Sequence, residues 1–598
     1  MRLTRAQARV VADEQAGRPE RMPDRAQGRR PLHEGTVLAA SVVGLLARPP
    51  YSGRPPGRNG TGLQTEQSAE DEQDQAHPLI RTHVRAHGGR FVGGSPTGGR
   101  LGPTARPGSG AGTGSSRRSP VVVPRVSAPS VGPVADLDFA AVRADLGIEE
   151  DYPGGAVEEA RTAAERLPAV LATLPDETAV PFVTVDPPGS RDLDQAVHLS
   201  RRDGGYRVRY AIADVASFVE PGGVLDIETW RRGATQYSPD RSVPLHPTEL
   251  SEGAASLLPG VVRAAVLWTI DLDAAGEPVA VDVHRAAVRS VARLDYAGVQ
   301  ADLDAGRAHP GIELLPEIGA LRTAIGRARH AITLDLPDIE VERGGDGHWT
   351  LVRRAVLPVE QANAEISLLT GTCAAVIMLR GLIGILRTLP VPGPEQVQTL
   401  RRATAALGIR WPAEESADSV IARMDGTRPM DAAFLEDAVR LLRGAGYTPF
   451  DGVVPEHTGH GGVGAAYAHV TAPLRRLVDR YGSEVCLALT AGTPVPDWVR
   501  RALPDLPAAM SAADRRSSAL AKAVQGAVST ALLGGREGEV FPATVLQIDA
   551  ERDRAVVVLH DPPVRANCSP RGLTEGTVVD VRLVSADPAT HRFVVEPV

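Results

Sequence analysis

The stretch FVTVDPPGSRDLDQ, residues 182–195, contains the features that decide the predicted fold and function of this chain. Its first four residues are apolar or β-branched and predict a strand. The Pro-Pro-Gly-Ser sequence that follows Asp186 predicts an irregular loop, because proline cannot join the ladder of a regular strand. Such a loop can fold the carboxylates of Asp186, Asp192 and Asp194 around one point.

Two interpretations of this loop stay open on spacing alone. Hard divalent cations such as Mg²⁺ take oxygen ligands, and several carboxylates repel one another unless a cation lies between them. A cation held there can activate water and stabilise the charge of a phosphodiester under attack. The alternative is a solvated turn rich in Asp, Gly and Pro, and the spacing by itself favours this second interpretation.

Strand and helix patterns alternate on both sides of the loop. Upstream, apolar residues three or four apart predict helices over 137–177, divided at Pro168. Downstream, the patterns predict a strand over 208–212 and a hairpin over 266–284, followed by helical segments at 315–332, 360–387, 396–406, 434–444 and 472–490. This order predicts an α+β fold with one large mixed domain over 178–510.

The two ends of the chain differ from this domain. After a polar connection at 511–535, alternating segments predict four short strands at 540–548, 555–560, 578–585 and 592–596. Together they predict a small OB-like β-barrel over 536–598. Residues 1–130 are rich in glycine and lack an apolar period. They predict a disordered low-complexity tail or a start assigned too far upstream, and the sequence does not separate the two.

Composition excludes several kinds of chemistry. The 598 residues carry a net charge of −8 and include one lysine, Lys522, so a phosphate-binding loop with its Gly-Lys pair is excluded. Three isolated cysteines cannot build a cysteine-rich zinc site, and they predict a reducing, cytoplasmic location. Residues 1–130 carry +9 and the remainder −17. A nucleic-acid partner therefore requires local rather than overall positive charge.

Three further patterns are given structural interpretations. The apolar run 366–386 is long enough to span a membrane, but it contains Arg380 and lacks flanking aromatic belts. We therefore predict a buried core helix and no membrane partner. The GHGGVG sequence at 459–464 lacks the strand–helix–strand unit that dinucleotide binding requires. Its glycines also argue against a helical zinc pair formed by His457 and His460.

A second candidate cluster is YAHVTAPLRR, residues 467–476. Pro473 predicts the start of a helix, which would place Thr471 near its N-cap and Arg475 and Arg476 in its first turn. Exposed helix amides beside arginine side chains form a corner that binds phosphate. The alternative is an ordinary capped helix with surface arginines. Tyr237 likewise has two interpretations, as a platform for a base or as a partly buried tyrosine with a paired hydroxyl.

Taken in order along the chain, four segments resemble the RNB domain of the ribonuclease II/ribonuclease R family. Asp186, Asp192 and Asp194 match the family's D-x5-D-x-D-D signature. Three more segments are similar to further family motifs: YAIADVASFV at 210–219, RGATQY through VPLHPTELS at 232–251, and YAHVTAPLRR at 467–476. The resemblance covers roughly residues 180–490, and the C-terminal barrel extends it.

The resemblance implies a metal-dependent 3′-to-5′ exoribonuclease that hydrolyses single-stranded RNA to nucleoside monophosphates. It implies that Asp186, Asp192 and Asp194 hold Mg²⁺, with Mn²⁺ as a second candidate, and that loss of Asp194 abolishes cleavage. The alternative is an RNB-fold protein that binds RNA with weakened or lost catalysis. No protein partner is predicted.

Arginine and tyrosine roles also follow from the resemblance. Arg475 is expected to contact the scissile phosphate, with Arg476 as a further RNA contact. Tyr237 is expected to stack on the 3′-terminal base of the RNA.

The chain departs from the family pattern at several positions. Gln195 replaces the fourth carboxylate, so the metal is expected to bind more weakly or with altered geometry. Ala472 replaces a serine beside the arginines, and the segment 386–390 lacks a histidine and a nearby aromatic residue. The helical pattern over 137–177 stands where the family has cold-shock barrels, so RNA is expected to be threaded and selected differently.

Overall fold

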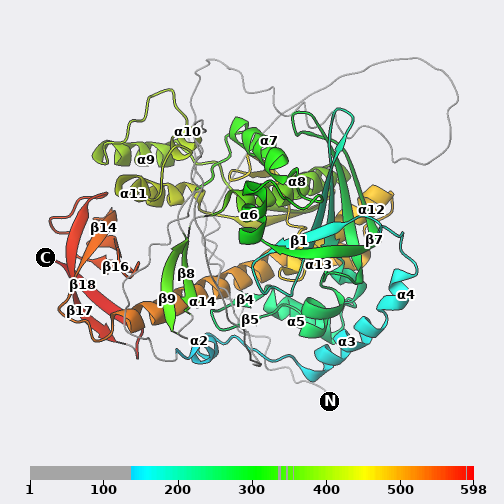
Figure 1. Cartoon of the computed structure of the whole chain (residues 1–598), viewed down its shortest axis with the longest axis horizontal. Helices are drawn as coiled ribbons and strands as arrows, with labels where there is room; N and C mark the ends of the chain where they lie inside the picture. Colours follow the sequence, from blue (N-terminus) through cyan, green and yellow to red (C-terminus); the bar gives the residue numbers. More distant parts are fainter. Residues whose placement is uncertain (1–136, 335–337, 345–347, 355, 588) are drawn as a thin grey trace, which may run out of the picture. The chain divides into compact units, whose positions relative to one another are not determined.

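The computed structural model describes residues 137–598, except 335–337, 345–347, 355 and 588. The predicted tail at 1–130 lies outside these residues. The first described elements are three helices, α2 (Phe139–Asp145), α3 (Gly154–Glu165) and α4 (Leu167–Leu171) (Figure 1). Pro168 lies in the first turn of α4, where its missing N–H removes no helical hydrogen bond. The predicted division of the helices at this proline is therefore confirmed.

Five strands after these helices close into a barrel in the order β1-β2-β3-β6-β7. They are β1 (Phe182–Asp186), β2 (Gln195–Arg202), β3 (Gly205–Ala213), β6 (Val262–Asp273) and β7 (Pro278–Asp295). β1 pairs antiparallel with β2 and parallel with β7, and the parallel pair closes the ring. The antiparallel β6–β7 pair confirms the predicted hairpin over 266–284.

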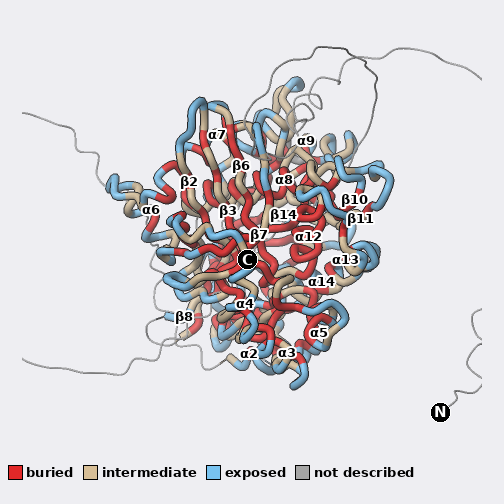
Figure 2. The backbone as a smooth tube through the Cα atoms, turned by 90° about the vertical axis from the view of Figure 1, so that its right-hand side faces the viewer, coloured by how far each residue is buried: buried red, intermediate tan, exposed pale blue. Residues whose placement is uncertain are grey.

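Side chains along the barrel strands alternate between two packing environments. Large residues such as Tyr210 and Trp268 belong to a core shared with helices α8 (Pro358–Gly381) and α12 (Leu477–Ala491). Small residues such as Ala211 belong to a second core, which they share with the alanines of α3. Figure 2 shows buried residues along α12 and along the barrel strands, so the helices and the barrel form one packed unit.

The apolar run 366–386 is divided between a helix and a strand. α8 ends at Gly381, and Ile383 begins β10 (Ile383–Thr388), which pairs with β11 (Gly446–Asp451). The prediction of one helix up to 387 was therefore wrong at its C-terminal end, where β-branched residues favour the strand. Among the described residues, α8 is the one helix long and apolar enough to cross a membrane. Within its apolar window 61% is buried inside the protein, which agrees with the predicted core helix.

The remaining elements of the mixed domain lie between these segments. Between β7 and α8 the chain forms α6 (Tyr296–Asp304), α7 (Leu315–Ala328), β8 (Asp338–Arg343) and β9 (Trp349–Arg354). Between β10 and β11 it forms α9 (Pro394–Ala406), α10 (Ala417–Ile421), α11 (Pro429–Ala438) and the turn η3 (Val439–Leu442). This second group has a hydrophobic core of its own around Phe434, so it is an inserted helical subdomain.

The connection predicted at 511–535 is a helix instead. After α13 (Asp497–Ala502), the long helix α14 (Leu506–Leu533) runs toward the C-terminal sheet (Figure 1). Leu520, Val524 and Val528 are spaced to form one apolar stripe, and all three are buried. The opposite face is rich in Ser, Ala and Arg, which is why the sequence resembled a polar connection.

The C-terminal strands form a curled antiparallel sheet in the order β16-β15-β14-β17-β18. They are β14 (Val540–Asp549), β15 (Arg554–Leu559), β16 (Arg565–Cys568), β17 (Val578–Asp587) and β18 (Arg592–Pro597). The edge strands β16 and β18 come into contact, so the sheet is nearly a barrel. The predicted α+β fold with a C-terminal OB-like barrel is confirmed; the short strand β16 was missed because four residues carry little alternation.

Candidate active site

The acidic loop connects two neighbouring strands of the barrel. β1 ends at Asp186 and β2 begins at Gln195, so the loop lies at one end of this antiparallel pair. Gly189 has a φ of +85°, a left-handed conformation that glycine adopts without steric cost. Ser256 holds the far side of the loop, because its hydroxyl accepts a 3.0 Å hydrogen bond from the N–H of Leu193. The loop is therefore an anchored part of the barrel end.

The segment 471–476 reaches the same end of the barrel. The N–H of Leu474 donates a 2.7 Å hydrogen bond to Oδ1 of Asp194, 280 residues away in the sequence. Nε of Arg475 lies 3.3 Å from Oδ2 of the same carboxylate. The fold thus brings together the acidic loop and the arginine that the sequence singled out separately. Asp194 is 3% exposed, and it faces the protein on both of its oxygens.

The helix predicted to begin at Pro473 begins four residues later. α12 starts at Leu477, with Arg476 in extended backbone geometry immediately before it. Asp479 in the first turn accepts a 2.7 Å hydrogen bond from the N–H of Ala472. It also accepts two bonds, of 2.7 and 2.8 Å, from the guanidinium of Arg476. Arg475 and Arg476 therefore belong to a turn held by a buried carboxylate, and the prediction that they lie in the first turn of a helix was wrong.

Asp479 is a residue that reasoning from the sequence missed. It is completely buried, and its partners are the segment that carries Arg475. An acid three residues after an arginine at a helix start was the available signal. Because Asp479 engages the guanidinium of Arg476, an RNA contact by Arg476 would have to share that group with an existing ion pair.

Burial dominates the electrostatics of the three aspartates. It raises the pKa of Asp186 to about 7 and that of Asp194 to about 8, against the opposing effect of the Arg475 charge. Burial also raises the pKa of Asp192, and the charge of Asp192 raises those of the other two. Desolvation disfavours the charge of Arg475 as well, but Asp194, Tyr237, Asp192 and Asp186 outweigh it and raise its pKa. These groups form one coupled cluster.

Tyr237 lies beside this cluster. It belongs to a short hairpin of β4 (Gln236–Tyr237) and β5 (Ser242–Val243), which follows helix α5 (Val224–Arg232). The N–H of Thr235 donates a 3.1 Å hydrogen bond to the carbonyl of Arg475, so the hairpin lies along the arginine segment. Partial burial and the charges of Asp192 and Asp194 raise the pKa of Tyr237. Its side chain stays 36% exposed, so a ligand can reach it.

Gln195, which replaces a family carboxylate, is bound at both ends of its side chain. Its Nε2 donates a 2.6 Å hydrogen bond to the carbonyl of Thr471, and its Oε1 accepts a 2.7 Å bond from the hydroxyl of Tyr210. The Tyr210 hydroxyl also lies 2.9 Å from Oγ of Ser367 in α8. Since the Thr471 carbonyl can only accept, these contacts fix the orientation of the amide. Gln195 thus connects β2 with the segment that carries Arg475.

Aromatic side chains that the sequence analysis did not single out lie behind the arginine segment. The hydroxyl of Tyr447 in β11 lies 2.8 Å from Nδ1 of His469, and the guanidinium of Arg387 lies over the Tyr447 ring at 4.5 Å. The His469 ring also contacts the Tyr467 ring, with centroids 5.4 Å apart. Where the segment 386–390 lacks an aromatic residue, Tyr447 on the paired strand therefore supplies a ring.

The donor chemistry of the acidic loop suits a hard divalent cation. Oδ2 of Asp186 is buried without a hydrogen-bond partner among the described residues, and the burial of three carboxylates is relieved by a cation. Among all the residues that the structure describes, no three His, Cys, Asp or Glu side chains are gathered closely enough to form a preassembled metal site.

Comparisons with known proteins identify two regions. Residues 175–485 match the RNB domain, and residues 539–598 match the RNase II-type exonuclease C-terminal S1 domain. Ribonuclease R of Escherichia coli is 29% identical over 327 residues, which are 50% of this chain and 38% of that protein. The exosome complex exonuclease RRP44 homolog A of Arabidopsis thaliana is 30% identical over 312 residues, which are 50% of this chain and 33% of that protein. The chain thus spans about a third of the length of these relatives.

Solved structures show the same fold. The apo form of Mycoplasma genitalium RNase R superposes with a TM-score of 0.68 at 19% identity, covering 77% of each chain. Yeast Ssd1, described as a pseudonuclease, has a TM-score of 0.56 at 16% identity, covering 76% of this chain and 59% of its own. At these identities the likeness establishes the fold. With the RNB match covering more than half of its length, the chain belongs to the RNB-domain family of the RNase II and RNase R exoribonucleases.

Proposed function

We propose that this chain is a metal-dependent 3′-to-5′ exoribonuclease that hydrolyses single-stranded RNA to nucleoside monophosphates. The observation that carries the proposal is the pairing of Asp194 with both Leu474 N–H and Arg475 at the end of the barrel. This pairing joins the acidic loop to a cation whose side chain is still 41% exposed. A phosphate can therefore reach the guanidinium while Asp194 stays buried.

The side chains of this site suit distinct parts of the reaction. Arg475 offers a planar guanidinium that can bind two phosphate oxygens and stabilise the charge that develops on them. Tyr237, next to it, offers an exposed ring on which a terminal base can stack. Asp186, Asp192 and Asp194 would hold Mg²⁺, or Mn²⁺ in its place, which supplies charge neutralisation and polarisation of water when bound.

The proposed ligand is single-stranded RNA. Mycoplasma genitalium RNase R, which shares this fold, has been solved with ribose-methylated single-stranded RNA and with double-stranded RNA. The terminal S1 domain matches a module of RNase II-type exonucleases. A cytoplasmic location stays a prediction.

A second candidate function is RNA binding without hydrolysis. Gln195 favours it, because the amide that replaces a carboxylate is already engaged by Tyr210 and Thr471. The fold likeness to the pseudonuclease Ssd1 shows that this architecture occurs without nuclease activity. Against it stands the retention of all three aspartates and of Arg475 in one coupled cluster.

One experiment distinguishes the two functions. The full chain is incubated with Mg²⁺ and 5′-labelled single-stranded RNA, beside Asp194→Asn and the control Asp302→Asn, which changes an exposed acid paired with Arg307. We expect a descending ladder from the wild type and the control, released mononucleotides, and intact RNA with Asp194→Asn. A substrate blocked by a 3′-phosphate should be degraded more slowly. RNA that all three proteins bind but leave intact would favour the second function.

A further inference from the structure

The hairpin that carries Tyr237 is too small to fix its own orientation. Each of its strands has two residues, and a short isolated hairpin is only marginally stable in water. Tyr237 must therefore be held by contacts from outside the hairpin. Several of those contacts come from the lead-in that precedes the RNB match, residues 137–152, beside the bond from Thr235 to Arg475 and a 3.0 Å bond from Ser517 in α14 to Gln236.

Arg143 in α2 binds the tip of the hairpin through its guanidinium group. Its two terminal nitrogens donate hydrogen bonds of 2.6 and 2.8 Å to the two oxygens of Asp240, and one of them also donates to the hydroxyl of Ser238. Its Nε donates a 2.6 Å bond to Glu150, which in turn accepts a bond from Arg241. Arg143 is 1% exposed, so its whole guanidinium is committed to these partners.

Hydrogen bonds within the tip of the hairpin accompany the bonds from Arg143. Oγ of Ser238 lies 2.9 Å from a carboxylate oxygen of Asp240 and 2.8 Å from the carbonyl oxygen of Arg241, and it can donate its one proton to either. Ser238 directly follows Tyr237, at the point where β4 ends and the turn of the hairpin begins. Arg143 therefore holds the turn residue next to the tyrosine.

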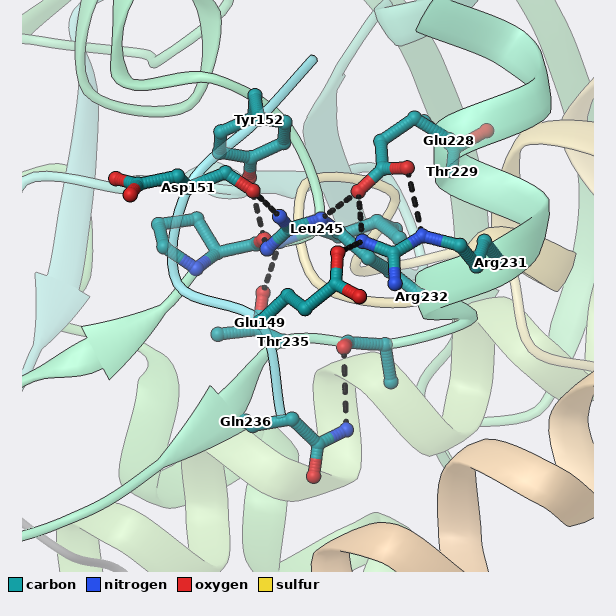
Figure 3. A network of polar contacts seen from close by, with 12 residues as sticks. Glu149, Asp151, Tyr152, Glu228, Thr229, Arg231, Arg232, Thr235, Gln236 and Leu245 are labelled. Atoms are coloured by element: carbon teal, nitrogen blue, oxygen red, sulfur yellow. Dashed lines mark hydrogen bonds and ion pairs between the residues drawn. The ribbon is translucent and has the colours of Figure 1, made fainter. Parts of the chain in front are cut away.

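A second set of contacts fixes the base of the hairpin. The guanidinium of Arg232, at the end of α5, donates a 2.7 Å bond to the carbonyl of Asp151 and lies 3.8 Å from the centroid of the Tyr152 ring (Figure 3). The Tyr152 hydroxyl donates to the carbonyl of Pro244, just beyond β5. Arg231 pairs with Glu149 at 2.9 Å. The lead-in therefore contacts both the tip and the base of the hairpin.

We propose that Arg143 is a positioning residue for RNA, which holds the 236–243 hairpin so that Tyr237 faces the terminal base beside Arg475. The proposal rests on the proposed role of Tyr237 as a stacking platform. Lysine cannot reproduce the bidentate bond to Asp240, so Arg143→Lys keeps the charge and removes the two parallel hydrogen bonds. Asp240→Asn weakens the same pair from the other side.

The test measures coupling between Arg143 and Tyr237 in RNA binding. A single-stranded RNA with 2-aminopurine at its 3′ end is titrated into the full chain in EDTA, and quenching of the probe reports stacking. We expect Tyr237→Ala to weaken binding by about 10-fold or more, as for loss of one stacked base. Arg143→Lys and Asp240→Asn should each weaken it severalfold and reduce the quenching.

The double variant Arg143→Lys/Tyr237→Ala separates positioning from a general loss of structure. If Arg143 acts through Tyr237, the double variant binds RNA no more weakly than Tyr237→Ala alone. A purely structural role would make the two effects multiply. The control Arg161→Lys changes an exposed arginine of the following helix α3, which pairs with Glu158, and should bind RNA like the wild type.

The outcomes distinguish this inference from the proposed function. If Tyr237→Ala weakens binding and Arg143→Lys does not, or if their effects multiply, Arg143 is not a positioning residue and the function of Tyr237 still stands. If Tyr237→Ala leaves binding and quenching unchanged, the stacking role and this inference both fail. If Arg143→Lys does not fold, Asp240→Asn tests the same ion pair from its other side.

Discussion

Gln195 donates a 2.6 Å hydrogen bond to the carbonyl of Thr471, a residue 276 positions later in the chain. This bond ties the first residue of β2 to the segment that presents Arg475. At the position of a family carboxylate, the chain therefore has an amide whose hydrogen bond connects two parts of the site. This hydrogen bond is a physical reason for an amide at position 195, because a carboxylate has no proton to donate to a carbonyl.

Replacement of Gln195 by glutamate should destabilise the protein. Gln195→Glu keeps the shape of the side chain but places an acceptor against the Thr471 carbonyl, which then lacks its donor. We expect a loss of roughly 1–3 kcal/mol in the free energy of unfolding, measured by denaturant titration. The matched control is Gln396→Glu, because Oε1 of Gln396 accepts from Gly393 N–H and a carboxylate can do the same. Equal stability of the two variants would contradict a stabilising role of the hydrogen bond between Gln195 and Thr471.

Gly371 in α8 permits the close approach of the segment around Tyr467. A Cβ atom there would lie 2.1 Å from Cε2 of Tyr467 and 2.5 Å from the carbonyl oxygen of Ala468. Gly371→Ala should therefore lower the unfolding free energy by about 1–3 kcal/mol or more, since a packed core does not absorb an added methyl. Gly154→Ala in α3, where a Cβ meets nothing within 4 Å, should be neutral or slightly stabilising. Thermal unfolding of both variants tests the difference.

Local rules predicted much of the fold and failed where distant residues intervene. The apolar run 182–185 predicted β1 and the alternation over 208–212 predicted β3, and the side chains of both strands pack into two cores. The rule that proline begins a helix failed at Pro473, where Asp479 captures the Ala472 N–H and the helix starts later. No local pattern could show that Asp479 is buried against this segment.

The candidate site was predictable in its residues and not in its connections. The carboxylates and the arginine segment were identified from a resemblance spread over four motifs, which says which residue types recur but not how they touch. The bond from Leu474 to Asp194 spans 280 residues and leaves no periodic trace in the sequence. Arg143 lies outside the motifs altogether, so only the fold reveals its contact with Asp240.

Asp437 should make the stability of the protein depend on pH. It lies in the last turn of α11 and accepts a 3.0 Å bond from Gln547 in β14. Burial and the nearby charge of Glu575 raise its pKa to about 6, against the opposing effect of Arg440. The folded state therefore binds a proton that the unfolded state has released between about pH 4 and pH 6, so this group's contribution to stability falls as the pH rises through that range.

Asp437→Asn removes this charge and keeps an acceptor for Gln547. We expect the variant to exceed the wild type in unfolding free energy by roughly 1–2 kcal/mol at pH 7.5, with the difference shrinking toward pH 4. Denaturant titrations at both pH values measure it, with the exposed Asp302→Asn as the control. A difference that grows on acidification would contradict the raised pKa.

Arg475 should be essential for the rate of RNA cleavage because its guanidinium has two tasks that a primary ammonium cannot combine. Its Nε lies 3.3 Å from Asp194, while the side chain is 41% exposed and can face a phosphate. In Arg475→Lys a single nitrogen must choose between the carboxylate and the substrate. We expect the single-turnover rate to fall by about 100-fold or more, with RNA affinity changed only severalfold, because the lost contact acts on charge that develops during cleavage. Arg307→Lys, which changes an exposed arginine paired with Asp302, should cleave at the wild-type rate. A variant that loses affinity and keeps its single-turnover rate would assign Arg475 to RNA binding alone.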